Sequence, residues 1–267
     1  MTVGSVLSGF RQIFVPKHYN RLALLVASNY DKSQFALRGC LNDMQMLEDK
    51  LTSLGVDGIV KLLGTDMTTS NWLDAMRGHA AKLSVNTIGF HGHSHHGSRH
   101  GASEVWCPDD FDGSEARMIQ DKQTRDILKT VKGRWLDWAD CCHAADSIRA
   151  ITFKDEKLKF IPEDRSPMLV SAIGQMISNI ADTVVDPEYA TNCLQLAACR
   201  SDQTSADAKI DGKYCGAFTY YGLKAWDAKA TYGSIIDKSK ALLSRNGYAQ
   251  SPEYCGADNN SNRRMLT

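Results

Sequence analysis

The stretch LALLVA, residues 22–27, decides how this chain folds. A short, uninterrupted apolar run is typical of a β-strand that is buried on both faces of a parallel sheet. Such a strand needs helices to cover it. The chain supplies one directly, because apolar residues recur at helical spacing over residues 41–54 and Gly55 follows as a C-terminal stop. We therefore predict a strand followed by a helix.

The same alternation continues to the C-terminal end. Strands that alternate with helices favour a mostly parallel sheet with helices on both faces, which is an α/β fold. Two polar stretches, residues 98–120 and 153–167, are predicted to be long loops. The remaining predicted strands are residues 58–63, 86–91, 134–141, 192–199 and 249–254, and the remaining helices are residues 69–83, 121–130, 168–180, 218–226 and 232–245.

The length allows one large α/β domain or two small ones, and we expect a single domain. We expect it to span residues 21–256, after a short N-terminal extension (residues 1–20) and before an Asn-containing tail (residues 257–267) that we expect to be disordered. Lys plus Arg and Asp plus Glu both number 31, so the net charge gives no reason to expect nucleic acid or an anionic membrane as a partner.

No feature of the sequence indicates secretion or membrane insertion. No apolar run approaches the roughly 20 residues of a membrane span, and the N-terminal residues lack the pattern of a signal peptide. We expect a cytoplasmic protein whose eight cysteines are free thiols.

Reactive side chains follow three of the predicted strands. They lie in residues 38–43, 91–98 and 140–143, and they include thiols, imidazoles and two carboxylates. The carboxyl ends of parallel strands share one edge of a sheet, where function collects in α/β folds. If these three ends meet, the set is that of a hydrolase.

Spacing selects which of these side chains can act together. Side chains alternate along an extended segment, so Asp140 and Cys142 point the same way, as do Ser94 and His96. A thiol paired with an imidazole gains thiolate character and attacks a carbonyl carbon.

A second pair lies at the start of the first helix. Cys40 and Asp43 are three residues apart and share a helical face. With Asp140 nearby, two carboxylates would form a pocket able to hold a guanidinium through forked, charge-assisted hydrogen bonds.

These residues resemble the motifs of the metacaspases, the caspase relatives of plants, fungi, protists and bacteria. The resemblance extends from about residue 21 to residue 256. Four stretches in order carry it: residues 37–43, 90–98, 140–145, and 201–207 followed by 216–219.

The resemblance implies a caspase-like three-layer sandwich built on a six-stranded sheet, and it favours a monomer. We expect no cofactor. It implies a cysteine endopeptidase with His96 as general base and Cys142 as nucleophile, and with the backbone N–H groups of Gly97 and Cys142 as oxyanion hole. It also implies a pocket for the residue before the cut (S1) that selects Arg or Lys in protein or peptide substrates, lined by Cys40, Asp43, Ser94 and Asp140.

The sequence departs from the family pattern near the catalytic residues. His95 stands where the family has Gly, Cys141 replaces a Ser, and residues 144–145 are Ala-Ala instead of Ser-Gly. None of these changes removes a catalytic atom.

Many metacaspases bind Ca²⁺, but the matching positions here include Lys122 and Arg149, which argue against a calcium site. A substitute set of oxygen ligands could come from Asp109, Asp110 and Asp112.

Three further interpretations stay open. In the first, the chain is a catalytically silent scaffold that binds basic peptide segments through Asp43 and Asp140. The histidine-rich stretch could hold zinc through His91, His93, His95 and His100, although no established zinc spacing supports this. Finally, an enzyme that cuts after basic residues could cut its own Lys-containing loop at residues 153–167.

Overall fold

Strand β1 (Arg21–Ala27) lies inside a six-stranded sheet and is buried along almost its whole length, as its apolar run predicts. The computed structural model describes residues 21–56, 58–101, 103–142, 157–161, 192–200, 203–256 and 261–266. The strand order is β12-β9-β7-β3-β1-β2, and all neighbours are parallel except β12 and β9. The other strands are β2 (Gly58–Leu63), β3 (Ile88–Ser94), β7 (Arg134–Asp140), β9 (Cys193–Ala197) and β12 (Glu253–Gly256).

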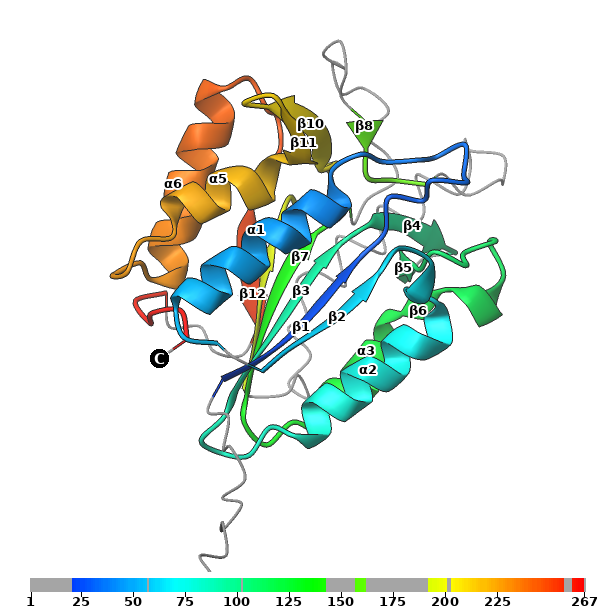
Figure 1. Ribbon diagram of the computed structural model, residues 1–267, viewed down its shortest axis with the longest axis horizontal. Coiled ribbons are helices and arrows are strands. Elements are labelled where there is room, and N and C mark those ends of the chain that lie inside the picture. Colours follow the sequence, from blue (N-terminus) through cyan, green and yellow to red (C-terminus); the bar gives the residue numbers. More distant parts are fainter. Residues whose placement is uncertain are drawn as a thin grey trace, which may run out of the picture.

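Helices cover both faces of this sheet (Figure 1). One face carries α1 (Cys40–Ser53), α5 (Ala217–Ala225) and α6 (Tyr232–Arg245). The other carries α2 (Thr69–Ala81) and α3 (Asp121–Leu128). The predicted α/β sandwich with a mostly parallel six-stranded sheet is therefore confirmed, and the predicted helix at residues 168–180 lies outside the described residues.

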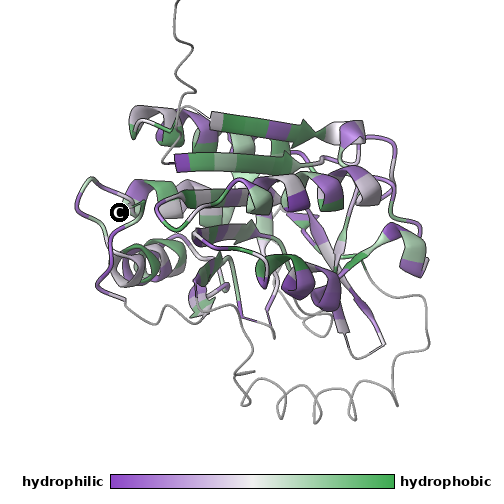
Figure 2. Cartoon of the chain, turned by 90° about the horizontal axis from the view of Figure 1, so that it is seen from below, coloured by the Kyte–Doolittle hydropathy of each residue, from purple (hydrophilic) through white to green (hydrophobic). Residues whose placement is uncertain are grey.

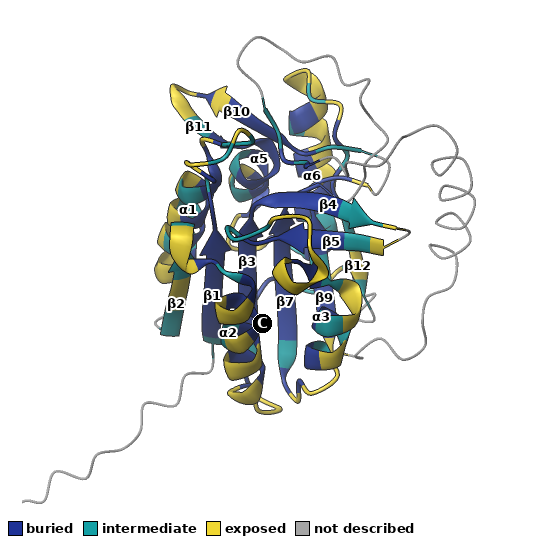
Figure 3. Ribbon diagram, turned by 90° about the vertical axis from the view of Figure 1, so that its right-hand side faces the viewer, coloured by how far each residue is buried: buried dark blue, intermediate teal, exposed yellow. Residues whose placement is uncertain are grey.

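The core is apolar and aromatic. Figure 2 shows that the central strands are largely hydrophobic while the helices present many hydrophilic residues. Figure 3 shows the same strands buried between exposed helix surfaces. Trp72 comes from α2, whereas Trp135 and Trp138 come from β7, and all three are almost completely buried. These tryptophans belong to the core.

The expected loop at residues 98–120 contains three short strands. β4 (His96–His100), β5 (Ser103–Cys107) and β6 (Ile119–Gln120) form a three-stranded antiparallel sheet. The polar residues of this stretch concealed the strands, because its buried apolar side chains form two short groups, Val105 to Cys107 and Met118 to Ile119.

A second small sheet joins two distant parts of the chain. The hairpin of β10 (Ala206–Ile210) and β11 (Lys213–Gly216) pairs with β8 (Lys157–Leu158), which lies inside the other expected loop. Asp211 and Gly212 both have positive φ in the turn, as a two-residue hairpin loop requires.

Part of the expected disordered tail is packed. Met265 and Leu266 are buried, and the carbonyl oxygens of Ser261 and Arg263 accept hydrogen bonds from the start of α6. These two apolar side chains pack into the hydrophobic core and anchor this part of the tail. Among the described residues, no helix is both long and apolar enough to cross a membrane.

His79 makes the fold sensitive to acid. Its ring is buried against Trp135, its Nε2 has no hydrogen-bond partner, and burial lowers its pKa to about 3. As the pH falls below the unfolded value of about 6.5, the unfolded chain binds a proton that the folded chain excludes. Stability is therefore full above pH 6.5 and falls toward pH 3.

We expect His79→Leu to remove this contribution. The pH dependence of the unfolding free energy between pH 6 and pH 4 should become shallower by up to about 1.4 kcal/mol per pH unit. Urea denaturation across this range measures it. The exposed Arg77→Ala on the same helix is the control, and an unchanged slope in the His79 variant would contradict the prediction.

Candidate active site

The ends of β3 and β7 bring the two predicted catalytic residues to one edge of the sheet. Ser94 and Asp140 are paired across these parallel strands at their last residues. His96 and Cys142 each lie two residues further along, so they leave the sheet from neighbouring positions. Both side chains are buried, with 1% exposure.

The ring of His96 has one occupied and one open nitrogen. Nε2 lies 2.6 Å from the carbonyl oxygen of Phe35, which can only accept, so Nε2 carries the proton. Nδ1 is buried and has no hydrogen-bond partner. Burial lowers the pKa of His96 to about 4. His96 is thus a neutral imidazole whose unprotonated nitrogen is available to a nearby proton donor.

The thiol of Cys142 lies against the chain just before β10. The Ser205 N–H donates to Cys142 Sγ at 3.0 Å, and Sγ lies 3.7 Å from the Ser205 carbonyl oxygen. This contact comes from a region that the sequence linked to the site only through its resemblance to the small-subunit region.

Residues 157–161 run through the site as an added strand. Lys157 and Leu158 pair with β10 on one side, and the Lys159 N–H donates to the Ser205 carbonyl at 3.1 Å. On the other side, the Ile161 N–H donates to the Gly97 carbonyl at 3.0 Å.

The carbonyl oxygen of Lys159 faces the two predicted oxyanion-hole donors. The N–H of Gly97 donates to it at 3.0 Å and the N–H of Cys142 at 3.4 Å. Gly97 is needed for this approach, because a Cβ there would lie 1.7 Å from the Cys142 carbonyl oxygen. A peptide carbonyl therefore sits between both donors.

The ammonium group of Lys159 occupies a fully buried acidic pocket. Its Nζ lies 3.0 Å from Asp43 Oδ2, 3.1 Å from Asp140 Oδ1 and 2.8 Å from Ser94 Oγ. All four side chains are fully buried. Three of the four residues predicted for the S1 pocket therefore surround one lysine side chain.

Further donors hold the two carboxylates in place. Ser94 Oγ donates to Asp43 Oδ2 at 2.6 Å, and the Gly216 N–H donates to Oδ1 at 2.7 Å. Asp140 Oδ1 accepts from Ser205 Oγ at 2.7 Å, while Oδ2 accepts from Thr219 N–H and Oγ1 at 2.9 and 2.7 Å. The pocket is rigid because nearly every oxygen lone pair has a partner.

The two acids share one cation unequally. Burial raises the pKa of Asp43 to about 7 despite the nearby Lys159 ammonium. Burial also acts on Asp140, but the Lys159 charge and the donors from Ser205 and Thr219 outweigh it and hold the pKa below its usual range. Asp140 is therefore the firmer anion. Cys40 is buried beside them, and burial raises the pKa of its thiol.

The sequence did not single out Lys159, Ser205 or Thr219 as site residues. Lys159 lies in a predicted loop whose apolar residues show neither helical nor strand spacing. Ser205 and Thr219 lie far along the chain from His96 and Cys142. Residues 143–145 and 149 lie outside the described residues.

The three aspartates considered for calcium serve separate contacts. Asp109 accepts from Ser28, Asp110 accepts from the Thr69 N–H at the start of α2, and Asp112 accepts from Ser114 and pairs with Arg117. Among the described residues, they do not form a group of carboxylates close enough to share an ion.

Comparison with known proteins agrees with this architecture. Residues 20–262 match the family described as Caspase domain (Peptidase_C14). The chain belongs to the caspase-domain family. It is 26% identical to Metacaspase-1 of Candida albicans over 86% of this chain and 63% of that protein, so it spans less than two thirds of that relative. It is 24% identical to Metacaspase-1 of Schizosaccharomyces pombe, over 87% of this chain and 66% of that protein.

A solved structure shares the fold. The crystal structure of protein GSU0716 from Geobacter sulfurreducens superposes with a TM-score of 0.67 at 19% identity, covering 93% of this chain and 98% of that one.

Removing the Lys159 ammonium should destabilise the protein. Breaking a buried ion pair by deleting one partner costs about 3–5 kcal/mol. We expect Lys159→Met, made in a background that also carries Cys142→Ala, to lose this much at pH 8. The loss should be smaller at pH 5, where Asp43, with its raised pKa, is protonated.

Urea denaturation at both pH values measures the effect. The control is Lys61→Met, which removes a partly exposed pair with Glu48 and should cost under about 1 kcal/mol. If both variants lose equally little, the pocket does not depend on its lysine.

Proposed function

We propose that this caspase-domain protein is a cysteine endopeptidase that cleaves peptide bonds after Lys or Arg, with Cys142 as nucleophile and His96 as general base. The observation that carries the proposal is Lys159. Its ammonium lies between Asp43 and Asp140 while its own carbonyl oxygen accepts from the Gly97 and Cys142 N–H groups. Lys159 is therefore held in the way expected for the basic residue that precedes the cleaved bond of a substrate.

The chemistry follows from the free nitrogen of His96. His96 Nδ1 accepts the proton of the Cys142 thiol, and the sulfur attacks the carbonyl carbon of the substrate's basic residue. The negative charge on the carbonyl oxygen is stabilised by the two N–H groups. His96 then gives its proton to the departing amine, and water hydrolyses the thioester to release the acid and the thiol.

Specificity for a basic side chain follows from charge. A neutral side chain in this pocket would leave two buried carboxylates without a cation, which is strongly unfavourable. An acidic side chain would add a third negative charge. A guanidinium can satisfy both carboxylates through its five donors.

Substrate backbones would bind as an added strand. The hydrogen bonds of residues 158–161 to β10, Ser205 and Gly97 use main-chain groups only. This mode of binding tolerates many side chains and leaves the pocket to select the residue before the cut.

Fluorogenic peptides that end in Arg, Lys or Asp test this proposal. We expect cleavage after Arg and Lys that is lost in Cys142→Ala and reduced at least 100-fold in kcat/KM by Asp140→Asn. The control variant is Asp74→Asn on the exposed side of α2, which should cleave normally. Cleavage only after Asp would contradict the pocket assignment. Binding of an Arg peptide without turnover would favour the silent scaffold.

We also propose that the chain cuts itself after Lys159. The segment is already held across Cys142 and His96, so the effective concentration of this bond is high. In the uncut chain the same segment fills the pocket and excludes other substrates. Cleavage would free the pocket.

Mass spectrometry of the purified protein tests self-cleavage. We expect a fragment that begins at Phe160 in wild type and in Lys159→Arg, and an intact chain in Cys142→Ala and Lys159→Met. Lys157→Met is the matched control, because this lysine lies outside the pocket and contacts the Ala36 carbonyl. An intact wild-type chain that hydrolyses Lys peptides would contradict the prediction.

A further inference from the structure

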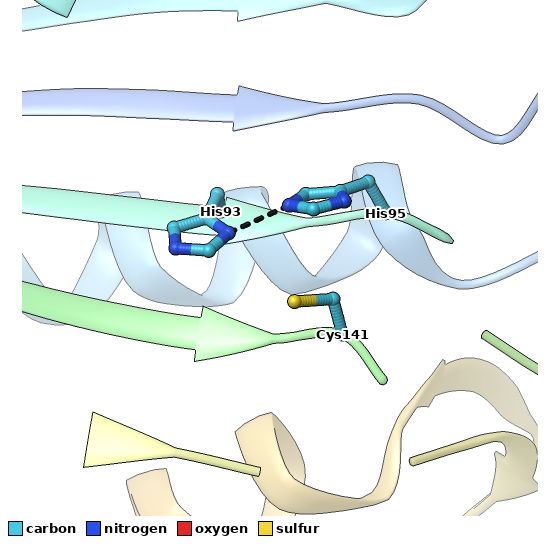
Figure 4. A group of neighbouring side chains, drawn as sticks. All are labelled: His93, His95 and Cys141. Atoms are coloured by element: carbon cyan, nitrogen blue, oxygen red, sulfur yellow. Dashed lines mark hydrogen bonds between the residues drawn. The ribbon is translucent and has the colours of Figure 1, made fainter. Parts of the chain in front are cut away.

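A buried cluster of histidines lies on the opposite side of β3 from Ser94. His93 and His95 come from the end of β3, and Cys141 follows β7 beside them (Figure 4). All three side chains are completely buried. One nitrogen of each imidazole and the Cys141 Sγ lie within 4.8 Å of one another. The cluster is independent of the function proposed above.

The hydrogen bonds of the two rings leave one nitrogen of each facing the other. His93 Nδ1 and His95 Nε2 are 2.7 Å apart. The outer nitrogen of His93, Nε2, lies 3.3 Å from the Asp137 carboxylate. The outer nitrogen of His95, Nδ1, lies 2.7 Å from the His96 carbonyl oxygen.

Asp137 is the carboxylate beside this pair. Its oxygens lie 3.3 Å from His93 Nε2 and 2.7 Å from His91 Nδ1, and one of them accepts from Gln195 Nε2 at 2.8 Å. This carboxylate therefore places negative charge next to the two rings.

We propose that His93 Nδ1, His95 Nε2 and the Cys141 thiolate form a zinc site. Zinc-bound histidines usually donate their second N–H to a carboxylate or a backbone carbonyl, and Asp137 and His96 already provide these two acceptors. Imidazole nitrogen and cysteine thiolate sulfur are both preferred zinc ligands, and zinc sites with three protein ligands hold a water in the fourth position. Water would complete a tetrahedron.

The charge of a bound ion would be compensated locally. Zinc would displace the proton between the two rings and the proton of the Cys141 thiol. Its two positive charges would then face the Cys141 thiolate and the Asp137 carboxylate, which satisfies the need of a buried charge for a partner.

The geometry needs only small movements. Tetrahedral zinc with Zn–N bonds of about 2.0–2.1 Å holds two ligand nitrogens about 3.3 Å apart. The rings must therefore separate by roughly 0.6 Å. A Zn–S bond of about 2.3 Å places the sulfur about 3.5 Å from each nitrogen, so the Cys141 Sγ, which lies within 4.8 Å of them, must turn toward the rings by rotation of its side chain.

A second grouping, His91, His93 and Asp137, also has close ligand atoms. It is the weaker candidate because His91 Nε2 already accepts from Trp72 Nε1 and Nδ1 donates to Asp137, with Gln195 as a further donor to the same carboxylate. His100, considered with this stretch, instead pairs with Glu115.

Cobalt substitution tests the site in the full chain. The chelator-treated protein is titrated with Co²⁺, which gives a thiolate-to-cobalt charge-transfer band and the visible bands of a tetrahedral ion. Zinc is then added to displace the cobalt. We expect one equivalent per chain and a rise in the thermal midpoint of roughly 5–10 °C at saturating zinc.

Variants identify the ligands. Cys141→Ser and His95→Ala should lose the charge-transfer band and weaken zinc binding at least 100-fold. Cys255→Ser, which removes an exposed thiol, and Cys142→Ala should bind as wild type does. Circular dichroism of Cys141→Ser checks that the variant is folded.

Two results would overturn the proposal. One is a folded wild-type protein without a charge-transfer band at millimolar Co²⁺. The other is a band that persists in Cys141→Ser and disappears in Cys142→Ala, because this would put the metal on the proposed catalytic pair instead.

Discussion

The ammonium of Lys159 between Asp43 and Asp140 is the interaction on which the candidate site depends. It joins the start of α1, the end of β7 and the segment 157–161 at one buried point. Buried charges are costly unless they are paired and hydrogen-bonded, and here donors from Ser94, Ser205, Gly216 and Thr219 complete both carboxylates. Because two buried carboxylates need a positive partner, the pocket is stable when it holds a cation, and it selects a cationic side chain.

Side chain and backbone of the segment are held by different parts of the fold. The acidic pocket takes the lysine side chain, whereas β10 and Gly97 take the main chain. The segment adds β8 as an edge strand to the β10–β11 hairpin. One short stretch of chain therefore uses both the main-chain binding edge and the acidic pocket at the same time.

The sheet and its covering helices could be predicted because buried parallel strands and amphipathic helices leave regular patterns of apolar residues in the sequence. The pairing of Ser94 with Asp140 was not predicted, because the polar end of β3 after His91 carries no apolar pattern. Lys159 could not be predicted, because nothing local marks a loop lysine that is buried by distant carboxylates. The Asp211-Gly212 turn was a readable hairpin signal, but short strands of mixed polarity concealed it. His95 and Cys141 were noted as separate departures from a family pattern, and only the tertiary structure brings them together.

Strand alternation places the two clusters on opposite sides of the same two segments. Cys142 and His96 face the segment 157–161, while their neighbours Cys141 and His95 turn toward Trp72 and the interior of the other layer. One peptide unit separates each member of one cluster from a member of the other. The His95 ring also binds the His96 carbonyl directly. An ion that drew His95 and Cys141 together would therefore fix the distance between their neighbours, the His96 imidazole and the Cys142 thiol. The ion itself would contact neither of these two groups.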